Sequence, residues 1–192
     1  MKLNVLAAGL VLVLAACSSG PREETSLPTP ETRSSEPAAA PAAGEELHMQ
    51  LEDGLVVIRL RPDLAPGHVA RYTQLAEQGF YDGTPFHRVI EGFMAQGGDP
   101  TGTGMGGSEL PDLKAEFSDA RFVRGTVGAA RSREPDSANS QFFIVYDDAH
   151  HLNGGYTVWG EVVSGMEHVD ALKRGEPVVN PDRIVTMRVA DD

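Results

Sequence analysis

FHRVIEGFMAQGGD, residues 86–99, carries more structural information than any other segment of this chain. Residues 86–90 predict a β-strand, in which alternate side chains face opposite sides. A second apolar run at residues 93–95 leads to Gln96 and a pair of glycines. Arg88 therefore lies in mid-strand among large apolar residues, where an unpaired cation is costly. From this residue alone two interpretations remain open: a guanidinium that reaches water along its apolar stem, or a functional cation.

Three further segments agree with the first in order and spacing. They read GFYDGT at residues 79–84, SQFFIV at 140–145 and HLNGGYTVWGEV at 151–162. Together with residues 86–99, they resemble the signatures of the cyclophilin family of peptidyl-prolyl cis–trans isomerases, bacterial type. The resemblance covers residues 47–190. It implies a closed eight-stranded antiparallel β-barrel capped by two α-helices, and an enzyme that acts on proline-containing peptide segments of client proteins.

Composition excludes one class of partner and one kind of cross-link. The chain has 192 residues, which favours a single folded domain, and its formal net charge is -12 from 28 acidic and 16 basic side chains. Nucleic-acid binding rests on clustered lysine and arginine, so no nucleic-acid partner is expected. The single cysteine excludes an internal disulfide.

The N-terminal segment predicts a lipoprotein. Residues 1–16 combine an early lysine with an apolar run of about ten residues, which is too short to span a bilayer and typical of a signal peptide. The run ends in Leu-Ala-Ala-Cys, which resembles the bacterial lipobox, so Cys17 is predicted to be lipidated. The alternative is a stray cysteine behind an ordinary cleavage site. Lipidation implies an envelope protein anchored to a membrane and facing the periplasm, and Ser18 favours the outer membrane.

Residues 17–46 predict a disordered tether, because proline, alanine and glutamate dominate and no apolar periodicity occurs. The folded domain is assigned to residues 47–192 and is expected to be monomeric. Its predicted strands are a hairpin at 47–51 and 55–60, then 125–130 and 140–146, and a last strand in which Val185, Met187 and Val189 alternate with polar residues. Its first predicted helix runs from Pro66 to Gly79, with an inward face of Val69, Tyr72, Leu75 and Ala76. A second, short helix has Met166, Val169 and Leu172 inward.

Two motifs are typical of nucleotide binding and of metal binding, but their surroundings in the sequence argue against both functions. Residues 102–107 fit the dinucleotide fingerprint GxGxxG, but that fingerprint requires a helix directly after it, and Pro111 follows instead. The run resembles the glycine loop at the rim of the cyclophilin groove. His150 and His151 follow two aspartates, yet adjacent histidines point in different directions on any regular element. We therefore expect neither a metal nor another cofactor.

The reaction implied by the resemblance needs no nucleophile. Rotation about an X–Pro amide has a barrier of about 18–20 kcal/mol, because the C–N bond has partial double-bond character. An apolar socket for the proline ring and a donor aimed at its nitrogen would lower that barrier. An arginine suits the donor role because it stays charged when half buried.

The resemblance assigns roles residue by residue. Arg88 is the expected donor, Phe93 a wall of the proline socket and Gln96 the group that holds the substrate carbonyl. The remaining expected substrate contacts are Met94, Gly104, Ser132, Gln141, Phe143, His151, Leu152 and Tyr156. Ser132 stands where many members have an asparagine whose backbone pairs with the peptide.

Two positions depart from many eukaryotic members of the family. His151 stands in the place of a tryptophan and Tyr156 in the place of a histidine, which implies weak cyclosporin binding. A rival interpretation from another class is a binding module or chaperone without catalysis. The enzyme is favoured because a peptide binder needs no buried cation, whereas this chain retains the whole set Arg88, Phe93, Met94, Gln96 and Phe143.

Overall fold

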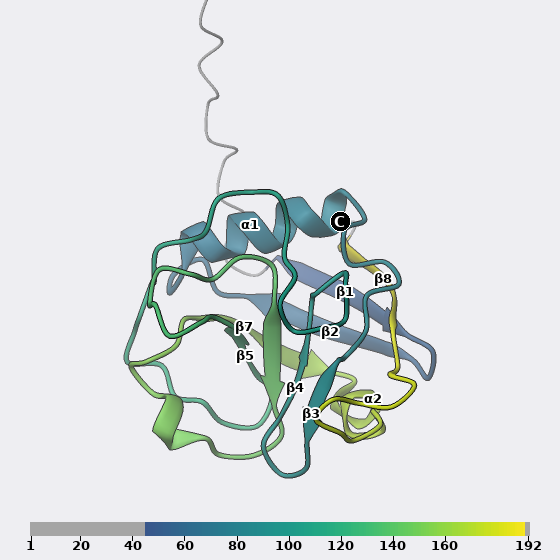
Figure 1. Cartoon of the computed structure of the whole chain (residues 1–192). Coiled ribbons are helices and arrows are strands. Elements are labelled where there is room, and N and C mark those ends of the chain that lie inside the picture. The colour runs from purple at the N-terminus through teal and green to yellow at the C-terminus, as the bar shows by residue number, and fades with distance from the viewer. Residues whose placement is uncertain (1–44, 191–192) are drawn as a thin grey trace, which may run out of the picture. The chain divides into compact units, whose positions relative to one another are not determined.

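The computed structural model describes residues 45–190 (Figure 1). The predicted signal peptide at 1–16, Cys17 and all but the end of the predicted tether lie outside the described residues. The strands are β1 Glu46–Leu51, β2 Leu55–Leu60, β3 Arg88–Ile90, β4 Met94–Gly97, β5 Thr126–Ala129, β6 Phe142–Val145, β7 Val158–Ser164 and β8 Ile184–Val189. The helices are α1 Pro66–Glu77, α2 Met166–Asp170 and a 3₁₀ turn, η1, at His150–Leu152. Between residues 45 and 190, no helix is long and apolar enough to cross a membrane.

The eight strands form one antiparallel sheet in the order β3-β4-β6-β5-β7-β2-β1-β8. The predicted hairpin is confirmed, since β1 pairs with β2 and Met49 lies opposite Val56. The sheet curls, α1 lies across one end of it and α2 lies near the other (Figure 1). The expectation of a mostly β fold with two helices is confirmed.

The expectation of a closed barrel is wrong. β3 and β8 are the two edges of the sheet, and in the described chain no ladder of backbone hydrogen bonds joins them. Residues 83–86, ahead of β3, instead bond residues 182–184 through backbone hydrogen bonds of 2.7 to 3.0 Å. The contact stays local because Pro85 has no N–H to donate and β3 is only three residues long. The same contact engages Phe86, and β3 therefore begins at Arg88 rather than at Phe86 as predicted.

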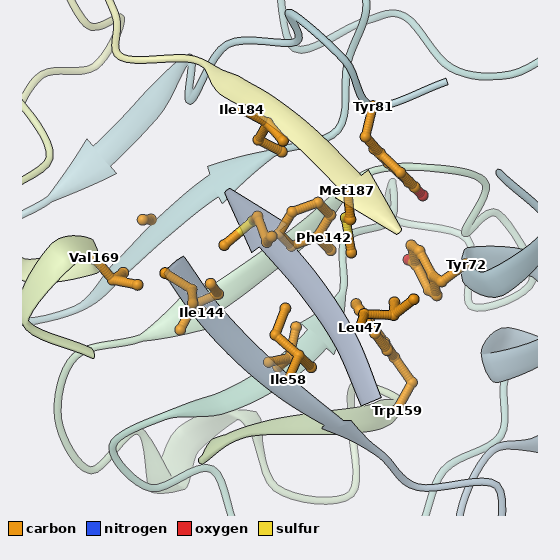
Figure 2. Packing of buried hydrophobic residues seen from close by; sticks show 14 of the residues in the cluster. Leu47, Ile58, Tyr72, Tyr81, Phe142, Ile144, Trp159, Val169, Ile184 and Met187 are labelled. Carbon is orange, nitrogen blue, oxygen red and sulfur yellow. The ribbon is translucent and has the colours of Figure 1, made fainter. Parts of the chain in front are cut away.

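The core fills the inside of the curl. Alternate residues of β1 are buried, as their apolar pattern predicts, and alternate residues of β2 are buried as well, although its nearly continuous apolar sequence predicts a strand buried throughout and Leu55 is exposed. Helix α1 adds the predicted apolar face of Val69, Tyr72, Leu75 and Ala76, all buried. The Trp159 ring stacks on Tyr72 with 4.1 Å between ring centroids, and Figure 2 shows this pair at one side of the cluster and Val169 of α2 entering from the other. The two helices thus cover opposite ends of one apolar core.

One predicted inward residue points outward. Val185 in β8 is 46% exposed, although Met187 is fully buried. The register between β1 and β8 shifts at this point, because Gln50 lies opposite Thr186 and Leu51 opposite Ile184. Val185 is therefore an extra residue in the ladder, and such a bulge turns its side chain away from the core.

A residue from a distant loop caps the N-terminus of α1. Ala65 at the N-cap position has no side-chain acceptor, and the first turn contains no acidic residue. The Glu116 carboxylate accepts from the N–H groups of Gly67 at 3.0 Å and His68 at 2.9 Å, and it lies 2.6 Å from His68 Nδ1. Burial lowers the pKa of His68, although Glu116 opposes that shift. Glu116 thus ties the loop before β5 to the helix.

Candidate active site

Seven of the predicted site residues meet around one cavity of about 120 Å³. They come from β3, the turn after it, β4, β6, η1 and the segment before β7. They are Arg88, Phe93, Met94, Gln96, Phe143, Leu152 and Tyr156.

Sheet register explains how residues far apart in sequence reach one cavity. β4 lies between β3 and β6, with Arg88 directly opposite Gln96 and Gln96 directly opposite Phe143. Side chains opposite each other in neighbouring strands share a face of the sheet and lie about 4.5–5.5 Å apart at Cβ. A cation, an amide and an aromatic ring therefore stand in a row across three strands.

The apolar side of the cavity is built from aromatic contacts. Phe143 is only 5% exposed, and its ring stacks on Phe122 with 5.6 Å between centroids. Tyr156 meets Phe143 edge to face at 5.7 Å. Phe93 lies in the turn before β4, with Met94 next to it in the strand. These side chains form an apolar pocket beside the Arg88 guanidinium.

The polar side is a chain of side-chain contacts. Arg88 Nη1 lies 3.5 Å from Gln96 Oε1, at the outer limit of a hydrogen bond. Gln96 Nε2 donates to Gln141 Oε1 at 2.9 Å, and Gln141 Nε2 donates to the carbonyls of Gly104 at 3.0 Å and Gly106 at 2.8 Å. The glutamine pair thereby links the arginine to the glycine loop.

A second, larger hollow adjoins the first. Its volume is about 430 Å³, and Gln96, Gly104, Ser132 and Gln141 are among the residues that line it. The Ser132 N–H donates to Ser137 Oγ at 2.9 Å. The Ser132 carbonyl in turn accepts from Arg131 Nη1 at 2.9 Å, so both backbone groups of Ser132 have partners within the protein.

Asp99 holds the glycine loop in shape and was missed by the sequence reasoning. It is completely buried and accepts from the N–H groups of Thr101, Gly104 and Gly106. Burial disfavours the charged carboxylate, but these hydrogen bonds outweigh it and lower the pKa of Asp99. A Cβ on Gly106 would lie 2.1 Å from Asp99 Oδ1, so only glycine allows this approach. The backbone of the loop is thus shaped by an anion beneath it.

Arg131 is a second cation at the site that the sequence reasoning did not single out. It lines both hollows. Its guanidinium carbon lies 4.5 Å from the centroid of the Tyr156 ring, and Nη2 donates to the Gly155 carbonyl at 2.7 Å. The sequence alone could not identify Arg131 as a site residue, because arginines flank Ser132 on both sides and only the fold shows which of them lies at the site.

His151 stands apart from the other predicted residues. It is exposed and lines neither hollow, but its ring lies 5.3 Å from that of Phe93. It therefore contacts the site at the rim. Among residues 45–190, no group of three or more His, Cys, Asp or Glu side chains is placed to hold a metal ion.

A family model and individual relatives with similar sequences all point to the same protein family. The family model described as "Cyclophilin type peptidyl-prolyl cis-trans isomerase/CLD" matches residues 46–189. A probable peptidyl-prolyl cis-trans isomerase of Brucella suis is 52% identical over 160 residues, covering 75% of this chain and 82% of the relative. Peptidyl-prolyl cis-trans isomerase B of Bacillus subtilis is 44% identical over 128 residues, covering 66% and 89%.

Solved structures agree. The Cryptosporidium parvum cyclophilin-type isomerase crystallised in the presence of the dipeptide Ala-Pro has a TM-score of 0.71 at 27% identity, covering 77% of this chain and 99% of that one. A cyclophilin from Hirschia baltica has a TM-score of 0.70 at 28% identity, covering 76% and 74%.

Proposed function

Because this chain belongs to the cyclophilin-type peptidyl-prolyl cis–trans isomerase family, we propose that its groove accelerates X–Pro bond rotation with Arg88 as the donor to the prolyl nitrogen. The substrates are proline-containing segments of client proteins. The observation that carries the assignment is the row in which Arg88, Gln96 and Phe143 lie opposite one another across β3, β4 and β6. This row places a cation next to an apolar pocket, as the reaction requires.

The mechanism follows from the electronic change at nitrogen. In the planar amide the nitrogen lone pair is delocalised into the carbonyl, and in the twisted transition state it is localised. A guanidinium N–H can then donate to that lone pair, an interaction absent in the planar ground state. Such differential stabilisation lowers the barrier to rotation. Arg88 is partly exposed, at 37% of its side chain, so its outer N–H groups are accessible to a bound peptide.

The remaining residues fix the substrate. Phe93, Met94, Phe143 and Leu152 hold the proline ring, while Gln96 donates an Nε2 hydrogen to the substrate carbonyl. Gln96 has two such hydrogens and uses one on Gln141, so the second is free for this role. No covalent bond is made or broken, so these residues act only by binding the substrate while the amide rotates.

The direct test of this function is an isomerisation assay. The purified protein should accelerate cis–trans exchange of a proline-containing peptide, measured by exchange NMR between the two resolved isomers. Bovine serum albumin at the same concentration controls for nonspecific effects. An exchange rate equal to the uncatalysed one would contradict the proposal and would favour a binding module without catalysis.

We further propose that the protein is a monomeric lipoprotein of the bacterial envelope, anchored through Cys17 and facing the periplasm, with the outer membrane favoured. The support is the Leu-Ala-Ala-Cys sequence behind a short apolar run, followed by Ser18. Acyl chains contribute about 0.8 kcal/mol for each buried CH₂, so several would hold the protein firmly. Cys17→Ser should move it from the membrane to the soluble fraction. Wild-type protein that is soluble without detergent would contradict the anchor.

A further inference from the structure

The loop at residues 174–178 lies alongside the strand that carries Arg88. Val89 and Gly175 exchange two backbone hydrogen bonds of 2.9 Å, and the Val178 N–H donates to the His87 carbonyl at 3.0 Å. Three backbone bonds therefore hold the backbone of this loop beside β3.

The Glu176 carboxylate leaves this loop toward Arg88. Its Oε1 accepts from Arg88 Nε at 2.5 Å. A second ion pair, between Arg174 Nε and Glu91 Oε2 at 2.5 Å, ties the same loop to the turn after β3. The two pairs have the same N–O distance and the Glu91 carboxylate is the more exposed of the two acids, but only the first pair involves a residue of the site.

We propose that Glu176 is a positioning residue that orients the Arg88 guanidinium for isomerisation. This assignment rests on the proposed role of Arg88. The planar guanidinium is held at Nε by Glu176 and approached at Nη1 by Gln96, which fixes its plane and leaves Nη2 for the substrate. Without Glu176, the long side chain is held at one point only, by a contact at the limit of hydrogen bonding.

Two effects of the carboxylate oppose each other, and the exposure of the pair decides between them. A negative charge beside the guanidinium weakens its attraction for the developing lone pair. However, the side chains of Glu176 and Arg88 are 58% and 37% exposed, so water screens this weakening effect of the negative charge. Misplacement of a catalytic group by about 1 Å can cost roughly 100-fold in rate. Orientation therefore dominates, and removal of Glu176 should slow the reaction.

The experiment separates the reach of the side chain from its charge. In the purified full-length protein, Glu176→Ala should lower kcat about 3- to 10-fold, with KM changed less than about two-fold. Glu176→Gln keeps an acceptor oxygen at the same distance without the charge and should retain most of the activity. Glu176→Asp keeps the charge but withdraws it by one methylene, and should lose nearly as much as Glu176→Ala.

Glu91→Ala is the matched control, because it breaks the other ion pair of the same loop and should leave kcat unchanged. Circular dichroism checks that each variant is folded. The assignment is overturned if Glu176→Ala is as fast as wild type or faster, if Glu176→Asp outperforms Glu176→Gln, or if Glu91→Ala loses as much. An inactive wild type overturns the proposed function and this assignment together, whereas an active wild type with an unaffected Glu176→Ala overturns this assignment alone.

Discussion

Glu116→Ala is expected to destabilise the folded domain by about 2–3.5 kcal/mol. The carboxylate provides acceptors for two N–H groups in the first turn of α1, Gly67 and His68, and for the buried imidazole of His68. Alanine removes both carboxylate oxygens and with them all three contacts. Ala65 cannot replace them, because its side chain has no oxygen.

The magnitude follows from those contacts taken separately. Loss of an N-cap acceptor costs about 1 kcal/mol, and loss of a negative charge near a helix N-terminus costs about 0.3–1 kcal/mol. His68 is fully buried, and leaving its Nδ1 without a partner costs about 1–3 kcal/mol. Partial access of water to the vacated space places the expected total in the lower part of the combined range.

Urea denaturation followed by tryptophan fluorescence measures this loss, because Trp159 stacks on Tyr72 of the same helix. Glu116→Gln keeps a neutral acceptor and should lose less than half as much. Glu109→Ala, which removes an exposed glutamate from the same region, is the control and should change stability by less than about 0.5 kcal/mol. A Glu116→Ala variant within that margin would refute the capping role.

Three more outcomes are expected. Phe143→Ala should raise KM about ten-fold or more with a smaller effect on kcat, because the lost ring contacts a proline in ground and transition states alike; an unchanged KM would contradict the socket. Cyclosporin should inhibit weakly, since His151 offers no indole N–H and Tyr156 adds bulk at the rim; titration in the isomerase assay tests this, and nanomolar inhibition would refute it. Burial lowers the pKa of His68 in the folded state, so the free energy of unfolding should be highest above about pH 6.5 and decline as the pH falls below it. His68→Gln should reduce the dependence of the melting temperature on pH between pH 7.5 and 5, and a pH dependence equal to that of the wild type would argue against this role.

The sequence predicted features that repeat locally. Alternation at Leu47, Met49 and Leu51 identified β1, and helical spacing identified the buried face of α1. Motif positions identified Arg88 and Phe143, two residues that the structure places around one cavity. In these cases, the information lies within a few neighbouring residues or in a sequence signature.

Features that depend on distant residues were missed. Glu116 caps a helix that lies 48 residues earlier, and Glu176 reaches Arg88 across 88 residues. Asp99 ends a recognised motif, but its role depends on how the following glycines fold back over it. The closed barrel was wrong for a similar reason, because closure depends on pairing between the two ends of the sheet. Neither periodicity nor a motif specifies such contacts.

The central claim, that Arg88 supplies the transition-state stabilisation, is tested most directly by Arg88→Ala and Arg88→Lys in the isomerisation assay. Loss of one preorganised donor predicts a decrease of about 100- to 1000-fold in kcat for Arg88→Ala, with peptide binding reduced less. Arg88→Lys should recover little, because an ammonium cannot address the prolyl nitrogen and Gln96 in the same planar geometry. Circular dichroism establishes that both variants are folded. A folded Arg88→Ala protein that isomerises the peptide as fast as wild type would contradict the mechanism.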